Sequence, residues 1–241
     1  MNDDRDRHTV ARIRTDEEEP LMTMMSDRLR RPAAVSALSV FVLALAGCAG
    51  SMPTLPSLGL GASAGAFTLS SPDIPAGSII ASRFVLNGFG CKGENVSPAL
   101  VWSNPPAGTK SYAIQVYDPD APTGSGFWHW GVYNIPASVT SLAQGAGNAA
   151  AKLPAGANGG HSDFHDTGAT GGNGNWGGPC PPVGDKPHRY VFTVFALGVD
   201  NLHAAAGIPK TGSAALHGFV LNKGLGDKLL GKASFTATYG R

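Results

Sequence analysis

Charged residues are few in this sequence, at 15% of 241 residues, and they nearly cancel to a formal net charge of +1. This balance gives no electrostatic basis for binding nucleic acid, which requires a basic surface. Cysteine is also rare, with 3 in the chain, whereas glycine (33) and proline (18) are abundant. Together these counts favour a single loop-rich β-domain over a helical bundle or a disordered chain.

The apolar run at residues 33–45 is shorter than the about 20 residues that a transmembrane helix needs. It follows a basic segment, residues 28–31, and ends in Leu45-Ala46-Gly47-Cys48. A positive flank, a short apolar stretch and small residues are typical of an export signal. Before a cysteine, they resemble the lipobox of bacterial lipoproteins, which implies cleavage before Cys48 and lipid attachment to its sulfur. The alternative, a buried core helix, leaves the flank and the cysteine unexplained.

The segments on either side of this signal differ in composition. Residues 1–24 contain an acidic run at 16–19, so we interpret them as an over-extended N-terminus, with the true start at Met24 or Met25. A cytoplasmic tail is the alternative. The signal peptide then covers residues 25–47. Residues 48–65 are rich in Pro, Gly and Ser, which is typical of a flexible tether. The folded domain is predicted to cover residues 66–241, anchored by lipid at the cell envelope.

Strand patterns dominate this predicted domain. Segments dense in apolar, aromatic and β-branched residues indicate strands at residues 78–84, 112–117, 128–135, 190–197 and 235–239. The first of them ends before the turn pair Asn87-Gly88. Residues 213–221 have helical character, with Thr211 as the candidate cap, and residues 144–178 are the least structured part. We therefore expect a mainly β fold with a few helices.

Two proline-rich loops at strand ends hold the candidate ligand-binding residues. These are Asp118, Asp120, Pro122 and His129 around the first loop, and Gly178, Pro179, His188 and Tyr190 around the second. Proline stiffens a loop, glycine lets backbone N–H groups approach a ligand, and histidine can take up a proton near neutral pH. We therefore expect a rigid pocket for a phosphate or carboxylate group, with Asp118 orienting a histidine. Binding is expected to weaken as the pH rises through the histidine range.

Several motifs in sequence order resemble the phosphatidylethanolamine-binding protein family, specifically its bacterial Raf-kinase-inhibitor-like branch. They include Gly-Glu-Asn-Val-Ser-Pro at 93–98, Asp-Pro-Asp-Ala-Pro at 118–122, Gly-Gly-Pro-Cys-Pro-Pro at 177–182 and His-Arg-Tyr-Val-Phe at 188–192. The resemblance implies a central antiparallel sheet with a second smaller sheet and a few peripheral helices. It also implies a small surface cavity that holds anions such as phosphate, acetate or cacodylate.

The resemblance also implies roles for single residues. Motif by motif, Asp118 and His129 match the pocket acid and histidine, Gly178 and Pro179 the wall, His188 and Tyr190 the second histidine and tyrosine, and Asp120 and Pro122 the supporting loop. Trp128 departs from the eukaryotic members, which have a further histidine there. Those members also border the cavity with a C-terminal helix, where this chain has the predicted strand 235–239. Phospholipid selectivity and kinase inhibition therefore do not carry over, and we expect a more open pocket.

The two cysteines of the predicted domain, Cys91 and Cys180, lie beside glycine-rich motifs. An exported domain folds in an oxidising compartment, so we predict a disulfide between them. The alternative is a pair of unbonded buried thiols. The disulfide would tie the loop after the first strand to the pocket wall.

A separate polar cluster contains His161, Asp163, His165 and Asp166. These residue types suit a metal ion, but the surrounding glycines and serines indicate a loop without the rigidity of a tight site. We therefore interpret the four side chains as solvated and expect no metal and no other cofactor.

Three classes of function remain open at this point. The first is a binding module whose pocket takes a small anion, such as a phosphorylated headgroup or peptide. The second is an inhibitor that binds a kinase or protease through the pocket rim. An enzyme is the weakest, because residues 66–241 contain no Gly-x-Ser-x-Gly elbow, no His-Glu-x-x-His pattern and no Walker loop. The expected partners are thus a small anion, the membrane through Cys48, and a protein, but not nucleic acid.

The lipobox resemblance generates the first testable prediction. Expression of the full chain is expected to give a product that begins at Cys48 and partitions into the membrane, whereas the Cys48→Ser variant loses the anchor. N-terminal sequencing and detergent partitioning measure both outcomes. A soluble wild-type product that still carries residues upstream of Cys48 contradicts the prediction.

Overall fold

The computed structural model describes residues 65–241 of the chain. The predictions for residues 1–24, for the signal peptide at 25–47, for Cys48 and for almost all of the tether therefore lie outside the described residues. Between residues 65 and 241, none of the helices has the length and apolar character needed to span a membrane.

A five-stranded antiparallel sheet forms the centre of the domain, in the order β10-β9-β5-β6-β8. Its strands are β5 (Ser111–Asp118), β6 (Phe127–Pro136), β8 (Asn158–Gly159), β9 (His188–Leu197) and β10 (Leu229–Tyr239). Most residues of β5 and β6 are buried, because both faces of the sheet are covered. Aromatic and β-branched side chains suit strands in that position.

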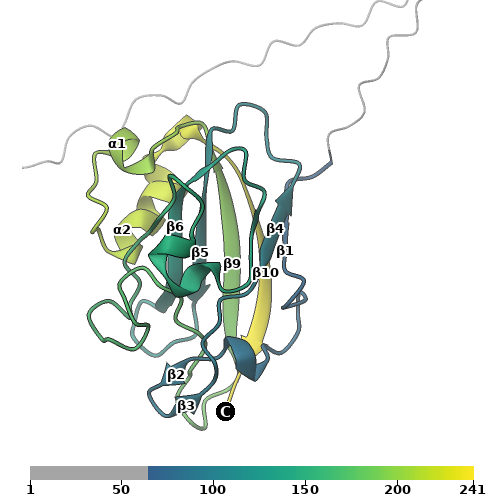
Figure 1. The fold of residues 1–241 in the computed structure, drawn as a ribbon, viewed down its shortest axis with the longest axis vertical. Coiled ribbons are helices and arrows are strands. Elements are labelled where there is room, and N and C mark those ends of the chain that lie inside the picture. The colour runs from purple at the N-terminus through teal and green to yellow at the C-terminus, as the bar shows by residue number, and fades with distance from the viewer. Residues whose placement is uncertain (1–64) are drawn as a thin grey trace, which may run out of the picture. The chain divides into compact units, whose positions relative to one another are not determined.

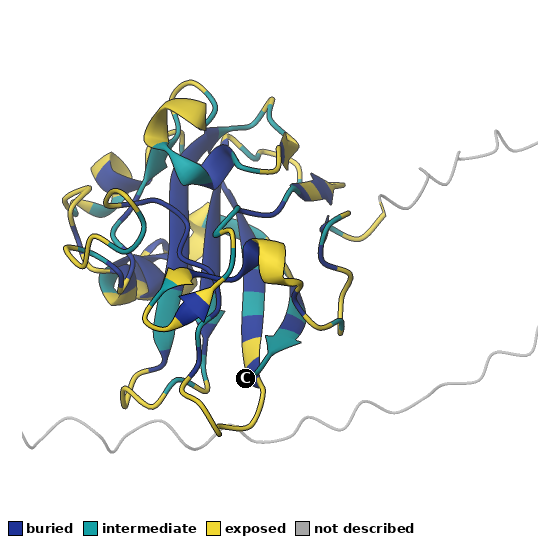
Figure 2. Cartoon of the chain, turned by 60° about the horizontal axis from the view of Figure 1, so that its bottom comes forward, coloured by how far each residue is buried: buried dark blue, intermediate teal, exposed yellow. Residues whose placement is uncertain are grey.

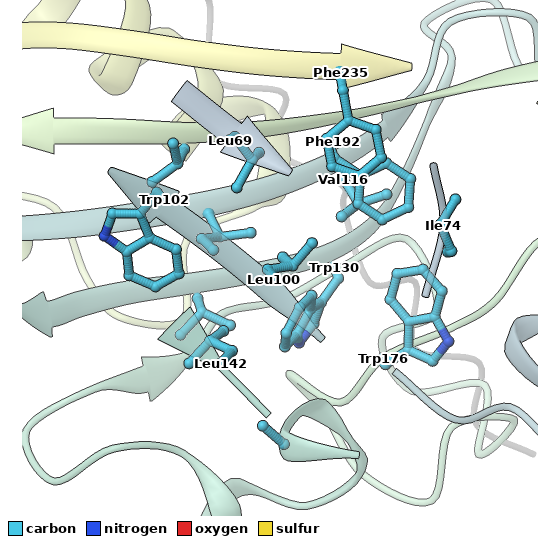
Figure 3. Close-up of a cluster of buried hydrophobic side chains, with 14 of the residues drawn as sticks. Leu69, Ile74, Leu100, Trp102, Val116, Trp130, Leu142, Trp176, Phe192 and Phe235 are labelled. Carbon is cyan, nitrogen blue, oxygen red and sulfur yellow. The ribbon is translucent and has the colours of Figure 1, made fainter. Parts of the chain in front are cut away.

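A second, three-stranded sheet packs on one face of the central sheet (Figure 1). It consists of β1 (Thr68–Ser70), β4 (Leu100–Ser103) and β7 (Ser141–Leu142) in the order β1-β4-β7. Strand β4 alternates buried and exposed residues, so Leu100 and Trp102 lie on the same apolar face. These two side chains pack with Val116, Trp130 and Phe192 of the central sheet and form the main core (Figure 3).

Short helical segments cover the opposite face of the central sheet (Figure 1). They are α1 (Leu202–Ala206), α2 (Ala214–Phe219), the π-helical turn η4 (Val220–Gly224) and the 3₁₀ turn η5 (Gly226–Lys228). Leu202 and Leu221 from these segments pack against Ala113, Tyr133 and Phe195 of the sheet as a second apolar cluster. The central sheet is therefore buried from both sides.

The remaining elements are short. They are the 3₁₀ helices η1 (Ser82–Phe84), η2 (Ala146–Asn148) and η3 (Ala150–Lys152), and the hairpin strands β2 (Asn87–Gly88) and β3 (Cys91–Lys92). The hairpin lies at the same end of the domain as the C-terminus (Figure 1). Burial concentrates in the central strands, while the loops and short helices carry most of the exposed residues (Figure 2).

The structure confirms the mainly β fold and four of the five predicted strands, which lie within β5, β6, β9 and β10. The predicted strand at residues 78–84 is wrong. This segment makes a single parallel bridge, between Ile79 and Thr238, and then turns into η1. Backbone hydrogen bonds close locally in that turn, from the Phe84 N–H to the Ala81 oxygen at 3.0 Å. Ile80 and Phe84 pack on the core from this loop, whereas Ile79 is exposed.

The turn and helix-cap residues of the structure differ from those predicted from the sequence. Asn87-Gly88 is not the hairpin turn, because it forms β2 and the turn is Phe89-Gly90. Ser213, not Thr211, caps α2 by accepting a hydrogen bond from the Leu216 N–H. Helix α1 is absent from the sequence prediction, since five residues are too few for a periodic pattern.

Two buried histidines link α1 and α2 to the central sheet. The Nδ1 of His217 lies 2.9 Å from the Ser213 carbonyl oxygen, and its Nε2 lies 3.1 Å from the Nε2 of His203. The Nδ1 of His203 lies 3.2 Å from the Asn134 side-chain nitrogen. A carbonyl only accepts, so His217 donates to Ser213, His203 donates to His217, and Asn134 donates to His203. All the side-chain nitrogens in this series of hydrogen bonds have partners only when both histidine rings are neutral.

The hydrogen bonds of His203 and His217 predict that the folded protein loses stability in acid. Burial lowers the pKa of His203 to about 4 and also lowers the pKa of His217. As the pH falls from about 6.5, the unfolded chain binds protons before the folded one, so stability decreases until about pH 4. Melting temperatures between pH 7.5 and 4 measure the effect. The decrease is expected to be smaller in His203→Gln, which can hydrogen-bond but does not titrate.

A control at His165, which is partly exposed, separates this effect from the general influence of histidines. His165→Gln is expected to keep the wild-type pH dependence. An NMR titration in which His203 and His217 take up protons near pH 6.5 in the folded protein contradicts the prediction.

Candidate anion-binding site

A cavity of about 270 Å³ opens at the end of the central sheet where β5 ends and β9 begins. Its walls come from β5, β6, β9, the loop between β5 and β6, the hairpin turn and the loop at residues 177–182, called the proline-rich loop below. The lining residues are Phe89, Asp118, Ala121, Pro122, Thr123, Phe127, His129, Phe164, Cys180, Pro181, Pro182, His188 and Tyr190. The structure thus brings Asp118, Pro122, His129, His188 and Tyr190, all predicted from the sequence, to one cavity.

Asp118 and His188 form a buried pair at the base of this site. The Oδ2 of Asp118 lies 2.7 Å from the Nδ1 of His188, and both side chains are almost fully buried. On the other side of the ring, the Nε2 of His188 lies 3.3 Å from the Oδ2 of Asp185. Both ring nitrogens of His188 therefore face carboxylates of the protein. His188 orders the site through Asp118 and leaves no nitrogen free for a ligand.

His129 is held differently. It lies on β6, is buried, and its Nδ1 lies 2.8 Å from the Gly177 carbonyl oxygen. The carbonyl accepts a hydrogen bond from the Nδ1–H, so the Nε2 of the neutral ring is an acceptor and is the nitrogen left for a ligand. Burial lowers the pKa of His129 to about 4, an effect that the Gly177 and Asp118 oxygens only partly oppose. The ring is therefore neutral near pH 7.

Tyr190 contributes an unpaired hydroxyl. Its side chain is fully buried, and its oxygen has no hydrogen-bond partner among residues 65–241. Burial raises the pKa of Tyr190 above its usual value, and the negative charge of Asp118 adds to the effect. The phenol therefore stays protonated and remains a donor. The ring packs edge-on against His129, with 5.1 Å between the centroids, so the two polar side chains are neighbours.

Asp120 fixes the loop between β5 and β6 to β9. Its Oδ1 accepts from the Arg189 Nη2 at 2.7 Å, and its Oδ2 accepts from the Arg189 Nε at 2.9 Å and backbone N–H at 2.8 Å. The Arg189 guanidinium lowers the pKa of Asp120 to about 2. This paired geometry sets the position of Pro122, which lines the cavity.

Gly178 and Pro179 do not line the cavity. The Gly178 N–H donates to the Asn95 side-chain oxygen at 2.8 Å, and the Pro179 carbonyl accepts from the Leu86 N–H at 3.1 Å. A Cβ on Gly178 would lie 2.1 Å from the Phe84 carbonyl oxygen. These residues therefore hold the proline-rich loop against the segment before β2, and the wall itself is made by Cys180, Pro181 and Pro182.

The structure joins Cys91 and Cys180 in a disulfide, 89 residues apart in sequence, as the sequence predicts. The bond connects β3 to the proline-rich loop, and Cys180 lines the cavity. The C-terminal residue Arg241 supports the same loop, because its Nε donates to the Pro181 carbonyl oxygen.

Three aromatic residues of the cavity were missed from the sequence: Phe89, Phe127 and Phe164. Phe127 adjoins the Trp-His-Trp segment, which is a usable signal, whereas Phe89 and Phe164 lie in glycine-rich loops without one. Trp128 lies outside this cavity. Its ring contacts Tyr117, with 4.5 Å between the centroids, and it lines a different cavity of about 400 Å³ beside α2.

The polar cluster at His161–Asp166 also lies elsewhere. His161 and His165 stack with 3.6 Å between their centroids, and the His165 Nε2 lies 2.8 Å from the Asp166 Oδ2. The Asp163 carboxylate accepts from the Trp128 N–H at 2.7 Å. Among the described residues, no group of three or more histidine, cysteine, aspartate or glutamate side chains is placed to hold a metal ion.

The domain thus combines two packed sheets with a cavity, partly polar and partly aromatic, at the end of its central sheet. The chain belongs to the phosphatidylethanolamine-binding protein family, whose profile matches residues 70–240. The match covers every cavity residue described above and all strands except the first two residues of β1.

Several relatives are known. The UPF0098 protein YbcL of Escherichia coli (strain K12) is 49% identical over 162 residues, covering 67% of this chain and 82% of YbcL. LppC of Mycobacterium tuberculosis (strain H37Rv), named as a lipoprotein, is 36% identical over 187 residues, covering 73% of this chain and 84% of LppC. The crystal structure of E. coli YbcL, described as a member of the mammalian PEBP family, superposes with a TM-score of 0.63 at 46% identity. It covers 73% of this chain and 98% of that one.

The contacts of Gly178 predict a structural effect at this position. Gly178→Ala is expected to destabilise the domain by about 3 kcal/mol, the upper end of the usual cost of overpacking, because the Cβ meets backbone atoms that cannot rotate away. Urea unfolding measures the change. Gly88→Ala is the matched control, since its Cβ meets nothing closer than 3.8 Å. Equal stability of the two variants contradicts the assignment.

Proposed function

We propose that the domain binds a small anion, through a phosphate or carboxylate group, in the cavity formed by Asp118, His129, His188 and Tyr190. The observation that carries the proposal is the Tyr190 hydroxyl, which is buried on the cavity wall without a hydrogen-bond partner among the described residues. Such a group destabilises the folded protein by about 1–3 kcal/mol when it stays unpaired. A bound oxyanion supplies the missing acceptor.

His129 provides the second contact, through its Nε2. In the free protein this nitrogen is an acceptor, because the ring proton is on Nδ1, which donates a hydrogen bond to the Gly177 carbonyl. A nearby anion favours the charged form of the ring, so the anion and a proton bind together. The protonated Nε2 then donates to the ligand, and a hydrogen bond of this charged kind is stronger than a neutral one. Asp118 and His188 stay paired behind the ligand and keep the site rigid.

The pH dependence follows from the free and bound pKa values of His129. The free value is about 4, and the bound anion raises it. Affinity therefore strengthens as the pH falls from the bound pKa to about 4, and the contribution of His129 is absent well above the bound pKa. The lower end of the window lies below the ordinary histidine range that the sequence suggests, because burial lowers the free pKa.

The location of the protein is part of the same proposal. Lipid attachment at Cys48 would hold the domain at the cell envelope, and a relative named as a lipoprotein, LppC, supports this placement.

Proteins of the family are largely non-catalytic binding proteins. In this cavity the one aliphatic hydroxyl on the wall, that of Thr123, donates to the Gly126 carbonyl. It is therefore engaged in its own loop and not paired with a base.

Calorimetric titration of inorganic phosphate tests the proposal. His129→Ala is expected to weaken binding by about 10- to 150-fold, as the loss of a charged hydrogen bond of ~1.5–3 kcal/mol requires. Titrations in two buffers with different ionisation enthalpies are expected to show proton uptake in wild type and none in His129→Ala. His161→Ala is the control, because His161 lines a different cavity.

Two outcomes contradict this prediction in different ways. Equal affinity and equal proton uptake in wild type and His129→Ala remove His129 from the site. The absence of binding by wild type to phosphate and to acetate overturns the anion site altogether and favours the alternative of a protein partner bound at the rim.

A further inference from the structure

Phe89 has a backbone conformation that its residue type disfavours. Five non-glycine residues of the described chain have positive φ: Asn95, Asn104, Asn134, Asp166 and Phe89. Asparagine and aspartate are the residues that tolerate this region, because their short polar side chains form local hydrogen bonds. Phe89, at φ 50°, is the exception. A bulky aromatic residue in this region is strained, and strain that persists at one position points to a function there.

The strain lies in the turn of a tight hairpin. Asn87 pairs with Lys92 and Gly88 with Cys91, which leaves Phe89 and Gly90 as a two-residue loop. Both loop residues have positive φ, at 50° and 82°, as a type I′ turn requires. Asparagine followed by glycine is the preferred pair in such a turn, so glycine is in its usual place and phenylalanine replaces asparagine.

Packing in the core does not explain this choice. The Phe89 side chain is 62% exposed, so burying it contributes little to folding. It nevertheless lines the cavity, and its ring lies parallel to that of Phe164 with 6.2 Å between the centroids. The hairpin is also held rigidly, since the next strand begins at Cys91, which is bonded to Cys180 on the cavity wall. The backbone thus fixes an exposed aromatic ring at the cavity mouth.

The cavity consequently has two halves. The polar side chains discussed above lie on β5, β6 and β9, whereas Phe89, Phe127, Phe164 and the two prolines of the proline-rich loop supply apolar surface. The volume of about 270 Å³ equals that of roughly nine liquid waters. A single phosphate or carboxylate group leaves much of this space free on the apolar side.

We propose that Phe89 is a specificity-determining residue: it forms an apolar subsite that selects anions carrying an apolar organic substituent, such as aryl or alkyl phosphate monoesters, over inorganic phosphate. This inference rests on the proposed anion site. The anionic group contacts Tyr190 and His129, and the substituent packs against the rings of Phe89 and Phe164. The strained turn and the disulfide hold the Phe89 ring in place before the ligand arrives, which lowers the entropy lost on binding.

Calorimetric titrations of phenyl phosphate and inorganic phosphate into wild type and Phe89→Asn test the proposal. Wild type is expected to bind phenyl phosphate at least about tenfold more tightly than inorganic phosphate. In Phe89→Asn this ratio is expected to fall to about two or less, while affinity for inorganic phosphate stays within about twofold. Because asparagine suits the turn, the melting temperature of Phe89→Asn is expected to equal or exceed that of wild type.

Val183→Asn is the matched control, since Val183 is 77% exposed and does not line the cavity. It is expected to keep the wild-type ratio, and Phe89→Tyr is expected to keep it as well. An unchanged ratio in Phe89→Asn overturns the inference but leaves the anion site intact. A lower melting temperature in Phe89→Asn overturns the strain argument. Failure of wild type to bind either compound overturns the inference and the proposed function together.

Discussion

The antiparallel pairing of β5 with both β6 and β9 is the constraint on which the site depends. Its register places Asp118 opposite Phe127, at the start of β6, and Tyr117 opposite Val191, near the start of β9. One end of β5 therefore meets the beginnings of both neighbours. Because those neighbours carry His129 and His188 within their first residues, the polar groups converge without any long loop having to position them.

Within this frame, the polar side chains divide into those that the protein satisfies and those that it leaves open. Two carboxylates face the His188 ring, and Asp120 binds Arg189 through both of its oxygens. These contacts make the walls rigid. Tyr190 and the Nε2 of His129 remain available for a ligand. At the cavity mouth, the disulfide and the strained turn hold Phe89 in place. Its ring is largely exposed, so it contributes little to the stability of the fold.

Much of the fold follows from local sequence. The dense aromatic and β-branched runs locate β5, β6, β9 and β10. In β5 and β6 most residues are buried, and strands covered on both faces need such residues throughout. The segment at 78–84 has the same apolar character and still forms no strand. It lies along β10 with one bridge and then closes hydrogen bonds within η1. Only Ile80 and Phe84 of this segment are buried, so apolar composition alone does not decide whether a segment pairs as a strand.

The same distinction applies to the site. Proline-rich motifs at strand ends, and the family resemblance they carry, predict Asp118, His129, His188 and Tyr190 as candidates, and the structure places all four at one cavity. They do not reveal that Asp185 approaches His188, nor that Phe89 and Phe164, 75 residues apart in the chain numbering, share a cavity wall. The sequence determined the strands, the residue types and the stiffness of the loops, since these depend on neighbours along the chain. The tertiary structure decided which polar atoms are paired and which stay open, because both depend on contacts between distant segments.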